Sequence, residues 1–344
     1  MDERREQTAL RRDPSFLLGP PATRAMPWDA ATADRAAGVL MGMACGDALG
    51  APYEFGPPID RDVPVGMVGG GPFAWAPGEW TDDTQMAVVL LEAAERAVAL
   101  DRTLLDLLDD VAVGWAAWAR TAADVGAQTR AVLGAASRQG PPTAARLTAA
   151  ATAHHARTGR SGGNGSLMRT APVALAYLDD GRALARAART VSSLTHHDPE
   201  AGDACVLWCA AIRHAVLTGE LDVRAGLDLL PTERQDTWSV RLTEAEQREP
   251  ASFASNGWVV EALQAAWSAI TAETSLRPAL EAAVRGGGDT DTVAAIAGAL
   301  LGARWGASAI PAPWLEVVHG WPRRLRVGEL GRRGLAVARS AVVS

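Results

Sequence analysis

The sequence has 344 residues, of which 48% are hydrophobic and 21% charged, and its formal net charge is -7 at pH 7. This acidic balance excludes an overall basic surface of the kind that binds nucleic acid. The first residues, MDERREQTAL, contain no apolar core of a secretory signal, and no uncharged apolar run reaches the roughly 18 residues of a membrane span. Frequent Ala, Leu and Arg, with few β-branched runs, favour helix over sheet. We therefore expect an all-α cytoplasmic protein with no membrane partner.

The first 30 residues differ in composition from the rest of the chain. They are polar and are interrupted by Pro14, Pro20, Pro21 and Pro27. Such a composition is typical of segments that have no packed core of their own. We predict a flexible or partner-ordered N-terminal extension over 1–30. The length of the remaining part, 31–344, fits either one large domain or two ordinary ones.

Two apolar segments carry a glycine at every fourth position. Glycines at this spacing form a smooth stripe along one face of a helix, and a second helix can approach such a face closely. We expect the two helices to lie deep in one core and to pack against each other. The stripes are Gly38, Gly42, Gly46 and Gly50 in the first helix and Gly298, Gly302 and Gly306 in the second.

A long Gly- and Pro-rich loop follows the first helix, from Phe55 to Trp80. Its aromatic and apolar residues favour an ordered, functional loop. Apolar periodicity predicts further helices along the chain, whereas the polar segment 232–256 is expected to be an exposed excursion. The predicted helical ranges are 82–100, 103–120, 127–138, 143–157, 181–192, 199–218, 257–270, 275–285, 289–305 and 323–340.

Two oxygen-rich segments stand directly before apolar helices: WTDDTQ, Trp80–Gln85, and GGGDTDT, Gly286–Thr292. Helix capping explains one such residue at each helix, because Asp and Thr side chains accept hydrogen bonds from free backbone N–H groups. Each segment supplies more oxygen ligands than one cap requires. Converging aspartates repel one another and are costly to bury without cations. Since carboxylates and hydroxyls are ligands of Mg²⁺, Mn²⁺ or Ca²⁺, we predict a split metal site.

Two other features leave alternatives open. SGGNGSLMR, Ser161–Arg169, is a glycine-rich stretch before a helix, which suits either an anion-binding nest or a simple turn.

Cys205 and Cys209 share a helix face near several histidines, which suggests zinc. Their spacing matches no standard zinc motif, so core packing is the favoured interpretation.

Together these segments resemble the ADP-ribosylglycohydrolase family, which includes the dinitrogenase-reductase-activating glycohydrolase and the ADP-ribosylarginine and ADP-ribosylserine hydrolases. The resemblance covers about residues 34–317, and the paired TDDT and DTDT signatures are its most specific part. It leaves the first thirty or so residues unexplained. The matching segments are GVLMGMACGDALGAPYEF, GEWTDDTQMAVVLLE, GGNGSLMRTAPVAL, SSLTHHDPEAGDACVLW, NGWVVEALQAAWSAI and GGGDTDTVAAIAGALLGARWG.

The resemblance implies a single domain over 31–344, a compact orthogonal helical bundle with two Mg²⁺ or Mn²⁺ ions in a central cleft. It implies that Glu54 stands near the scissile bond and acts in catalysis with aspartates of the metal shell, Asp82, Asp289 and Asp291. The implied metal ligands are Thr81, Asp82, Asp83, Asp289, Asp291 and Thr292. The implied ADP-ribose contacts are Gly163, Asn164, Gly165, Ser166 and His196, with His197 in place of His196 if the register differs by one.

The expected activity is metal-dependent hydrolysis of the N- or O-glycosidic bond between ADP-ribose and an acceptor. The first choice of acceptor is arginine on a protein, and serine, a nucleobase or a small molecule are alternatives. A different class of function is an immunity or binding protein that blocks an ADP-ribosyltransferase toxin through residues 1–30. The intact ligand set argues against a purely non-catalytic role. A two-metal phosphatase fits the oxygen ligands but not the order of the motifs.

Overall fold

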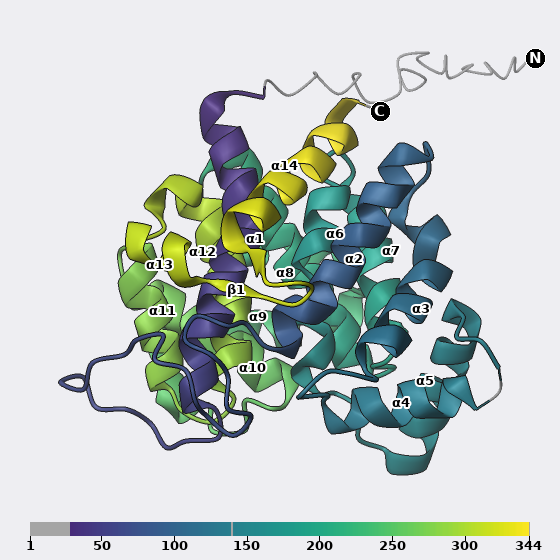
Figure 1. The fold of residues 1–344 in the computed structure, drawn as a ribbon, viewed down its shortest axis with the longest axis horizontal. Helices are drawn as coiled ribbons and strands as arrows, with labels where there is room; N and C mark the ends of the chain where they lie inside the picture. Colours follow the sequence, from purple (N-terminus) through teal and green to yellow (C-terminus); the bar gives the residue numbers. More distant parts are fainter. Residues whose placement is uncertain (1–27, 139, 344) are drawn as a thin grey trace, which may run out of the picture.

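Two glycine-rich helices, α1 (Ala30–Gly50) and α12 (Thr290–Trp305), lie against each other in the middle of the fold (Figure 1). The computed structural model describes residues 28–138 and 140–343. In it the two backbones touch, because a Cβ placed on Gly42 or on Gly302 would overlap the backbone of the opposite helix. Only glycine fits at such a contact. The predicted close packing of the two stripes is confirmed.

The two helices run antiparallel, so the end of α1 meets the beginning of α12. Gly38 faces Gly302, and Gly50 faces Thr290. The Thr290 hydroxyl donates to the Gly50 carbonyl oxygen at 2.9 Å, although the two residues are 240 positions apart. The GGGDTDT turn therefore lies beside the segment that leaves α1.

Further helices surround this pair, and the predicted all-α class and helical bundle are confirmed. The other α-helices are α2 (Asp82–Ala99), α3 (Leu108–Trp118), α4 (Ala127–Ser137), α5 (Ala144–Thr158), α6 (Ala171–Ala176), α7 (Gly181–Ser193), α8 (Pro199–Thr218), α9 (Thr232–Gln247), α10 (Val259–Thr271), α11 (Leu276–Arg285), α13 (Ala312–Val317) and α14 (Val327–Val343). The 3-10 helices are η2 (Ala51–Tyr53), η3 (Leu104–Leu107), η4 (Asn164–Ser166), η5 (Val223–Leu229), η6 (Pro250–Ser252) and η7 (Ala307–Ala309). The named strands of the described ranges, β1 (His319–Gly320) and β2 (Leu325–Arg326), pair antiparallel.

The segment 232–256 differs from its prediction as an exposed excursion. Its first part forms α9, which buries Trp238, Leu242 and Ala245 and packs against α10. These three apolar residues lie at helical spacing, but they are a weak stripe among many polar residues, which is why the sequence did not reveal the helix.

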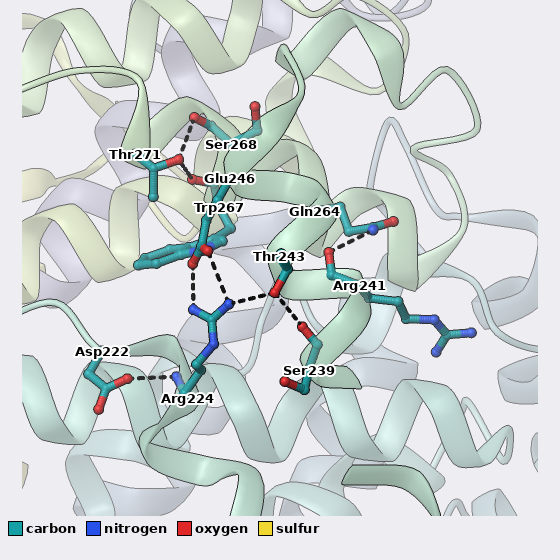
Figure 2. A network of polar contacts seen from close by, with 10 residues as sticks. All are labelled: Asp222, Arg224, Ser239, Arg241, Thr243, Glu246, Gln264, Trp267, Ser268 and Thr271. Atoms are coloured by element: carbon teal, nitrogen blue, oxygen red, sulfur yellow. Dashed lines mark hydrogen bonds and ion pairs between the residues drawn. The ribbon is translucent and has the colours of Figure 1, made fainter. Parts of the chain in front are cut away.

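Polar contacts tie α9 to its neighbours, as Figure 2 shows. The carboxylate of Glu246 on α9 accepts a hydrogen bond from Arg224 Nη2 in η5 at 3.0 Å. It also accepts one from Trp267 Nε1 of α10 at 3.0 Å. One acidic side chain thus links three elements, and α9 is part of the bundle.

The long loop after α1 projects from one side of the bundle but is tied to it (Figure 1). Within it, Gly70 and Trp75 exchange two backbone hydrogen bonds of 2.8 and 2.9 Å. At its end, the N–H of Trp80 donates to the His319 carbonyl oxygen at 3.0 Å. These contacts agree with the predicted ordered loop.

The predicted N-terminal extension falls mostly outside the described residues, which begin at Trp28. Asp29 caps α1, because its carboxylate accepts from the N–H of Thr32 at 2.7 Å. The boundary between the extension and the domain stays a prediction. Within the described ranges, no helix is both long enough and apolar enough to cross a bilayer.

Candidate metal centre and active site

The two oxygen-rich segments converge on one cavity of about 310 Å³. Asp82 at the start of α2 lines it together with three residues at the start of α12, namely Asp289, Asp291 and Thr292. Glu54, from the segment that leaves α1, lines the same cavity. The antiparallel packing of α1 on α12 therefore assembles the site from distant parts of the sequence.

Carboxylate oxygens gather there in two groups that share Asp291. One group is Asp47, Asp83 and Asp291, and the other is Glu54, Asp289 and Asp291; in each, one oxygen per residue lies within 4.8 Å of the others. Oδ1 of Asp83 and Oε2 of Glu54 are buried and have no hydrogen-bond partner among residues 28–138 and 140–343. Buried carboxylates without partners are costly, and hard divalent cations are bound by such oxygens. The residues present therefore fit a divalent cation.

The crowding of these carboxylates shows in their pKa values. Burial, and then the neighbouring carboxylates, raises the pKa of Asp82, Asp83 and Asp291 well above the usual range. The same causes raise the pKa of Glu54 to about 8. Ionisation of all these carboxyl groups at once is therefore unfavourable unless a positive charge offsets their negative charges.

Helix capping does not explain the aspartates of the two motifs. Asp289 is the N-cap residue of α12, but its side chain makes no capping hydrogen bond, and neither does Thr81 at α2. The cap of α2 comes from α1 instead, because the two carboxylate oxygens of Asp47 accept from the N–H groups of Thr81 and Thr84 at 2.8 and 3.0 Å. The motif aspartates thus keep oxygens for other partners.

Three site residues were missed by the sequence analysis: Asp47, Asp124 and Asn256. Asp124 lines the cavity, and burial, followed by the charge of Asp289, raises its pKa. The Asn256 side chain accepts from the Asp289 N–H at 3.0 Å and donates to the Gly287 carbonyl oxygen at 2.8 Å, which fixes the glycine turn. Asp47 and Asn256 stand in segments that the sequence analysis singled out, GDALGAPYEF and NGWVVEALQAAWSAI, whereas Asp124 does not.

The predicted ADP-ribose loop lies on the same cavity, which Gly163, Asn164 and Gly165 line. The Asn164 side chain is already engaged, because its Nδ2 donates to Asp289 Oδ2 at 2.7 Å. Ser166 is buried behind the loop, where its hydroxyl accepts from Ser192 Oγ at 2.9 Å. Asn164 therefore positions a predicted metal ligand, and the contact of Ser166 with ADP-ribose stays a prediction.

The two adjacent histidines occupy different environments. His196 is buried and lines the cavity. His197 packs against His155, with ring centroids 5.8 Å apart. The geometry thus favours His196 over His197 as the ligand-facing residue.

The cysteines of α8 serve packing. Cys205 and Cys209 are fully buried, and Cys209 Sγ lies 3.2 Å from the Thr170 hydroxyl. The groups of possible metal ligands within the described ranges consist of carboxylates alone. The zinc alternative is therefore dropped.

A sequence profile of the ADP-ribosylglycohydrolases matches residues 29–341. The chain belongs to the ADP-ribosylglycohydrolase family. One similar family member is the ADP-ribosylarginine hydrolase Tri1 of Pseudomonas putida (strain GB-1), which is 33% identical over 85% of this chain and 76% of its own length. Another is the ADP-ribosyl-[dinitrogen reductase] glycohydrolase of Rhodospirillum rubrum, which is 29% identical over 82% of this chain and 90% of its own length. A solved structure described as an ADP-ribosylglycohydrolase-related protein complex has a TM-score of 0.65 and 30% identity, over 90% of this chain and 99% of that one. This ADP-ribosylglycohydrolase is thus an enzyme that cleaves glycosidic bonds, as the sequence predicted.

Proposed function

We propose that this ADP-ribosylglycohydrolase removes ADP-ribose from arginine side chains of proteins and uses two divalent cations, Mg²⁺ or Mn²⁺. The observation that carries the metal dependence is the pair of buried carboxylate groups that meet at Asp291. Arginine as the acceptor is supported by the similarity to an ADP-ribosylarginine hydrolase.

The cations would be held by the aspartates at the starts of α2 and α12. Asp83, Asp289 and Asp291 belong to the two carboxylate groups, and Thr81, Asp82 and Thr292 complete the proposed ligand set. Bound cations supply Lewis-acid polarisation of the oxygens that they coordinate and offset the carboxylate charges. Asn164 and Asn256 keep Asp289 in place, through hydrogen bonds of 2.7 Å to its carboxylate and 3.0 Å from its N–H.

The chain's own residues would move the proton. Hydrolysis adds water to the anomeric carbon of the distal ribose, breaks the bond to the guanidine nitrogen and leaves a proton on that nitrogen. An aspartate of the ligand set, Asp82, Asp289 or Asp291, takes the proton of the attacking water. Glu54, whose Oε2 has no partner in the described ranges, assists departure of the arginine or opening of the ribose ring. The products are ADP-ribose and unmodified arginine.

The rim of the cavity suits a cationic acceptor. Phe55 lines the cavity with 67% of its surface exposed, and its backbone is left-handed with φ 61°. A 2.7 Å hydrogen bond from its N–H to the Gly288 carbonyl oxygen holds it there. An exposed aromatic ring attracts a guanidinium through its π face. The carboxyl group of Asp124, which lines the same cavity, adds attraction when it is ionised. A neutral serine linkage would use neither attraction.

The acceptor is tested with matched peptides that carry ADP-ribose on arginine or on serine. With Mg²⁺ or Mn²⁺, we expect release of free ADP-ribose from the arginine peptide at a much higher kcat/KM than from the serine peptide, and none in EDTA. Mass spectrometry of both products gives the measurement. Faster release from serine would overturn the choice of acceptor, and release that survives EDTA would overturn the metal dependence.

Glu54→Gln is expected to lower kcat by about 100-fold or more, because positioned proton transfer typically contributes 10²–10⁴-fold. The amide keeps the shape of the side chain, so the melting temperature should change little. Glu233→Gln, at an exposed residue of α9, is the matched control and should keep full activity. Unchanged hydrolysis in Glu54→Gln would remove this residue from the scheme.

The second candidate function, inhibition of an ADP-ribosyltransferase, depends on residues 1–30. Residues 1–27 lie outside the described part of the chain. The transferase partner and the cytoplasmic location therefore stay predictions.

A further inference from the structure

A fully buried arginine lies behind the ADP-ribose loop. Arg169 is 0% exposed, and none of the ion pairs within residues 28–138 and 140–343 includes its guanidinium. It stacks over the Trp115 ring at 4.0 Å from the centroid and donates from Nη2 to the Thr195 hydroxyl at 2.6 Å. Burying a charge without an opposite charge is costly. This cost indicates that Arg169 has a role other than filling space in the core.

The contacts of Arg169 determine where the Thr195 hydroxyl places its proton. A guanidinium has donors only, so the Thr195 oxygen must accept from it. The Thr195 side chain is fully buried, and its other hydrogen-bond partner within the described ranges is His196 Nδ1, at 2.8 Å. A buried hydroxyl needs an acceptor for its own proton. The Thr195 hydroxyl therefore donates to Nδ1 of His196.

This direction fixes the tautomer of His196. A neutral imidazole has one donor nitrogen and one acceptor nitrogen, so a ring that accepts at Nδ1 carries its hydrogen on Nε2. Burial, and then the positive charge of Arg169, lowers the pKa of His196 well below its usual value, and the ring is neutral at pH 7.

The protonated nitrogen lies beside the glycine loop of the cavity. A Cβ placed on Gly165 would lie 3.2 Å from His196 Nε2, and one on Gly163 would lie 3.4 Å from it. Both glycines line the cavity, as His196 does. Nε2 has no hydrogen-bond partner within the described ranges, so its N–H is available to an oxygen of a molecule bound in the cavity.

We propose that Arg169 and Thr195 are positioning residues that hold His196 as its Nε2–H tautomer, so that the ring donates a hydrogen bond to an oxygen of ADP-ribose. The opposite tautomer would turn a lone pair toward that oxygen and repel it. The inference rests on ADP-ribose as the bound part of the substrate, and not on arginine as the acceptor.

The tautomer is measured first, on the wild-type enzyme, by ¹⁵N NMR of its imidazoles, with the His196 signals assigned through His196→Gln. We expect an unprotonated Nδ1 and a protonated Nε2 near pH 7. This measurement needs no bound ligand, and the variant serves only to assign the signals. A ring protonated at Nδ1, or at both nitrogens, would overturn the proposal.

Thr195→Val keeps the shape of the side chain and removes its hydroxyl. We expect it to weaken the Nε2–H preference and to raise the Kd of ADP-ribose, measured by calorimetry on the metal-loaded enzyme, about tenfold, the usual worth of one hydrogen bond. In a His196→Ala background, the same substitution should not raise the Kd further, because it acts through that ring. A structural role alone would weaken binding in both backgrounds, and that result would contradict the proposal.

Thr152→Val is the matched control. The Thr152 hydroxyl lies 3.2 Å from His197 Nδ1, on the neighbouring histidine. We expect this change to alter neither the His196 tautomer nor the Kd of ADP-ribose. Failure of the proposed function would appear separately, as a wild-type enzyme that binds ADP-ribose but releases none from the arginine peptide.

Discussion

Asp289→Asn combined with Asp291→Asn should lower kcat/KM for ADP-ribose release by more than about 100-fold. Even changes to residues that only support a metal ligand typically cost 10–100-fold in metal affinity or activity. Here two proposed ligands lose their charge, and Asp291 belongs to both buried carboxylate groups. The measurement is kcat/KM across a titration of Mn²⁺ or Mg²⁺.

Thermal melting of the same variant separates loss of the metal from loss of the fold. Cations that bind only the folded state raise the melting temperature of the wild-type protein. The double variant should lose this rise. In EDTA it should melt no lower than the wild type, because asparagine keeps the shape while it removes two charges from a site where buried carboxylates repel one another.

Asp228→Asn with Asp236→Asn removes the same number of charges from exposed positions in η5 and α9. This control should keep both hydrolysis and the response to Mn²⁺. A double variant at Asp289 and Asp291 that still hydrolyses the substrate in a metal-dependent way would place the cations elsewhere.

The features of this enzyme that could be predicted from the sequence are those set by residues close together in the chain. Glycines such as Gly42 and Gly302 repeat at the spacing of one helix face, so the closeness of their helices could be inferred without a structure. The TDDT and DTDT segments were also placed correctly at helix starts, because each directly precedes an apolar stretch with helical periodicity. Their convergence follows from two sets of contacts with α1. The antiparallel packing on α12 brings Thr290 to Gly50, and Asp47 of α1 accepts from the N–H groups of Thr81 and Thr84 at the start of α2.

The parts that were missed depend on contacts between distant residues. Asp47 accepts from the N–H of the N-cap residue of α2, 34 residues later, and Asn256 holds a turn 31 residues away. No local pattern specifies such partners, because a single Asp or Asn in a helix or loop has many possible roles. The contact of Ser166 with ADP-ribose stays a prediction from its motif, and the hydroxyl of this residue accepts from Ser192 in the interior.

Gly302→Ala should lower the free energy of unfolding by about 3 kcal/mol, at the upper end of the usual cost of overpacking. A methyl group on Gly302 would overlap the carbonyl group of Gly38, and a backbone cannot move aside as a flexible side chain can. Alanine favours helix over glycine by only about 0.5–1 kcal/mol, so the steric cost dominates. Urea unfolding followed by circular dichroism gives the difference.

Gly328→Ala is the control for the same chemical change. Gly328 lies in α14, and a Cβ there would meet nothing within 4 Å. It should be neutral or stabilising by up to about 1 kcal/mol. If Gly302→Ala were as stable as Gly328→Ala, α1 and α12 could not be in backbone contact.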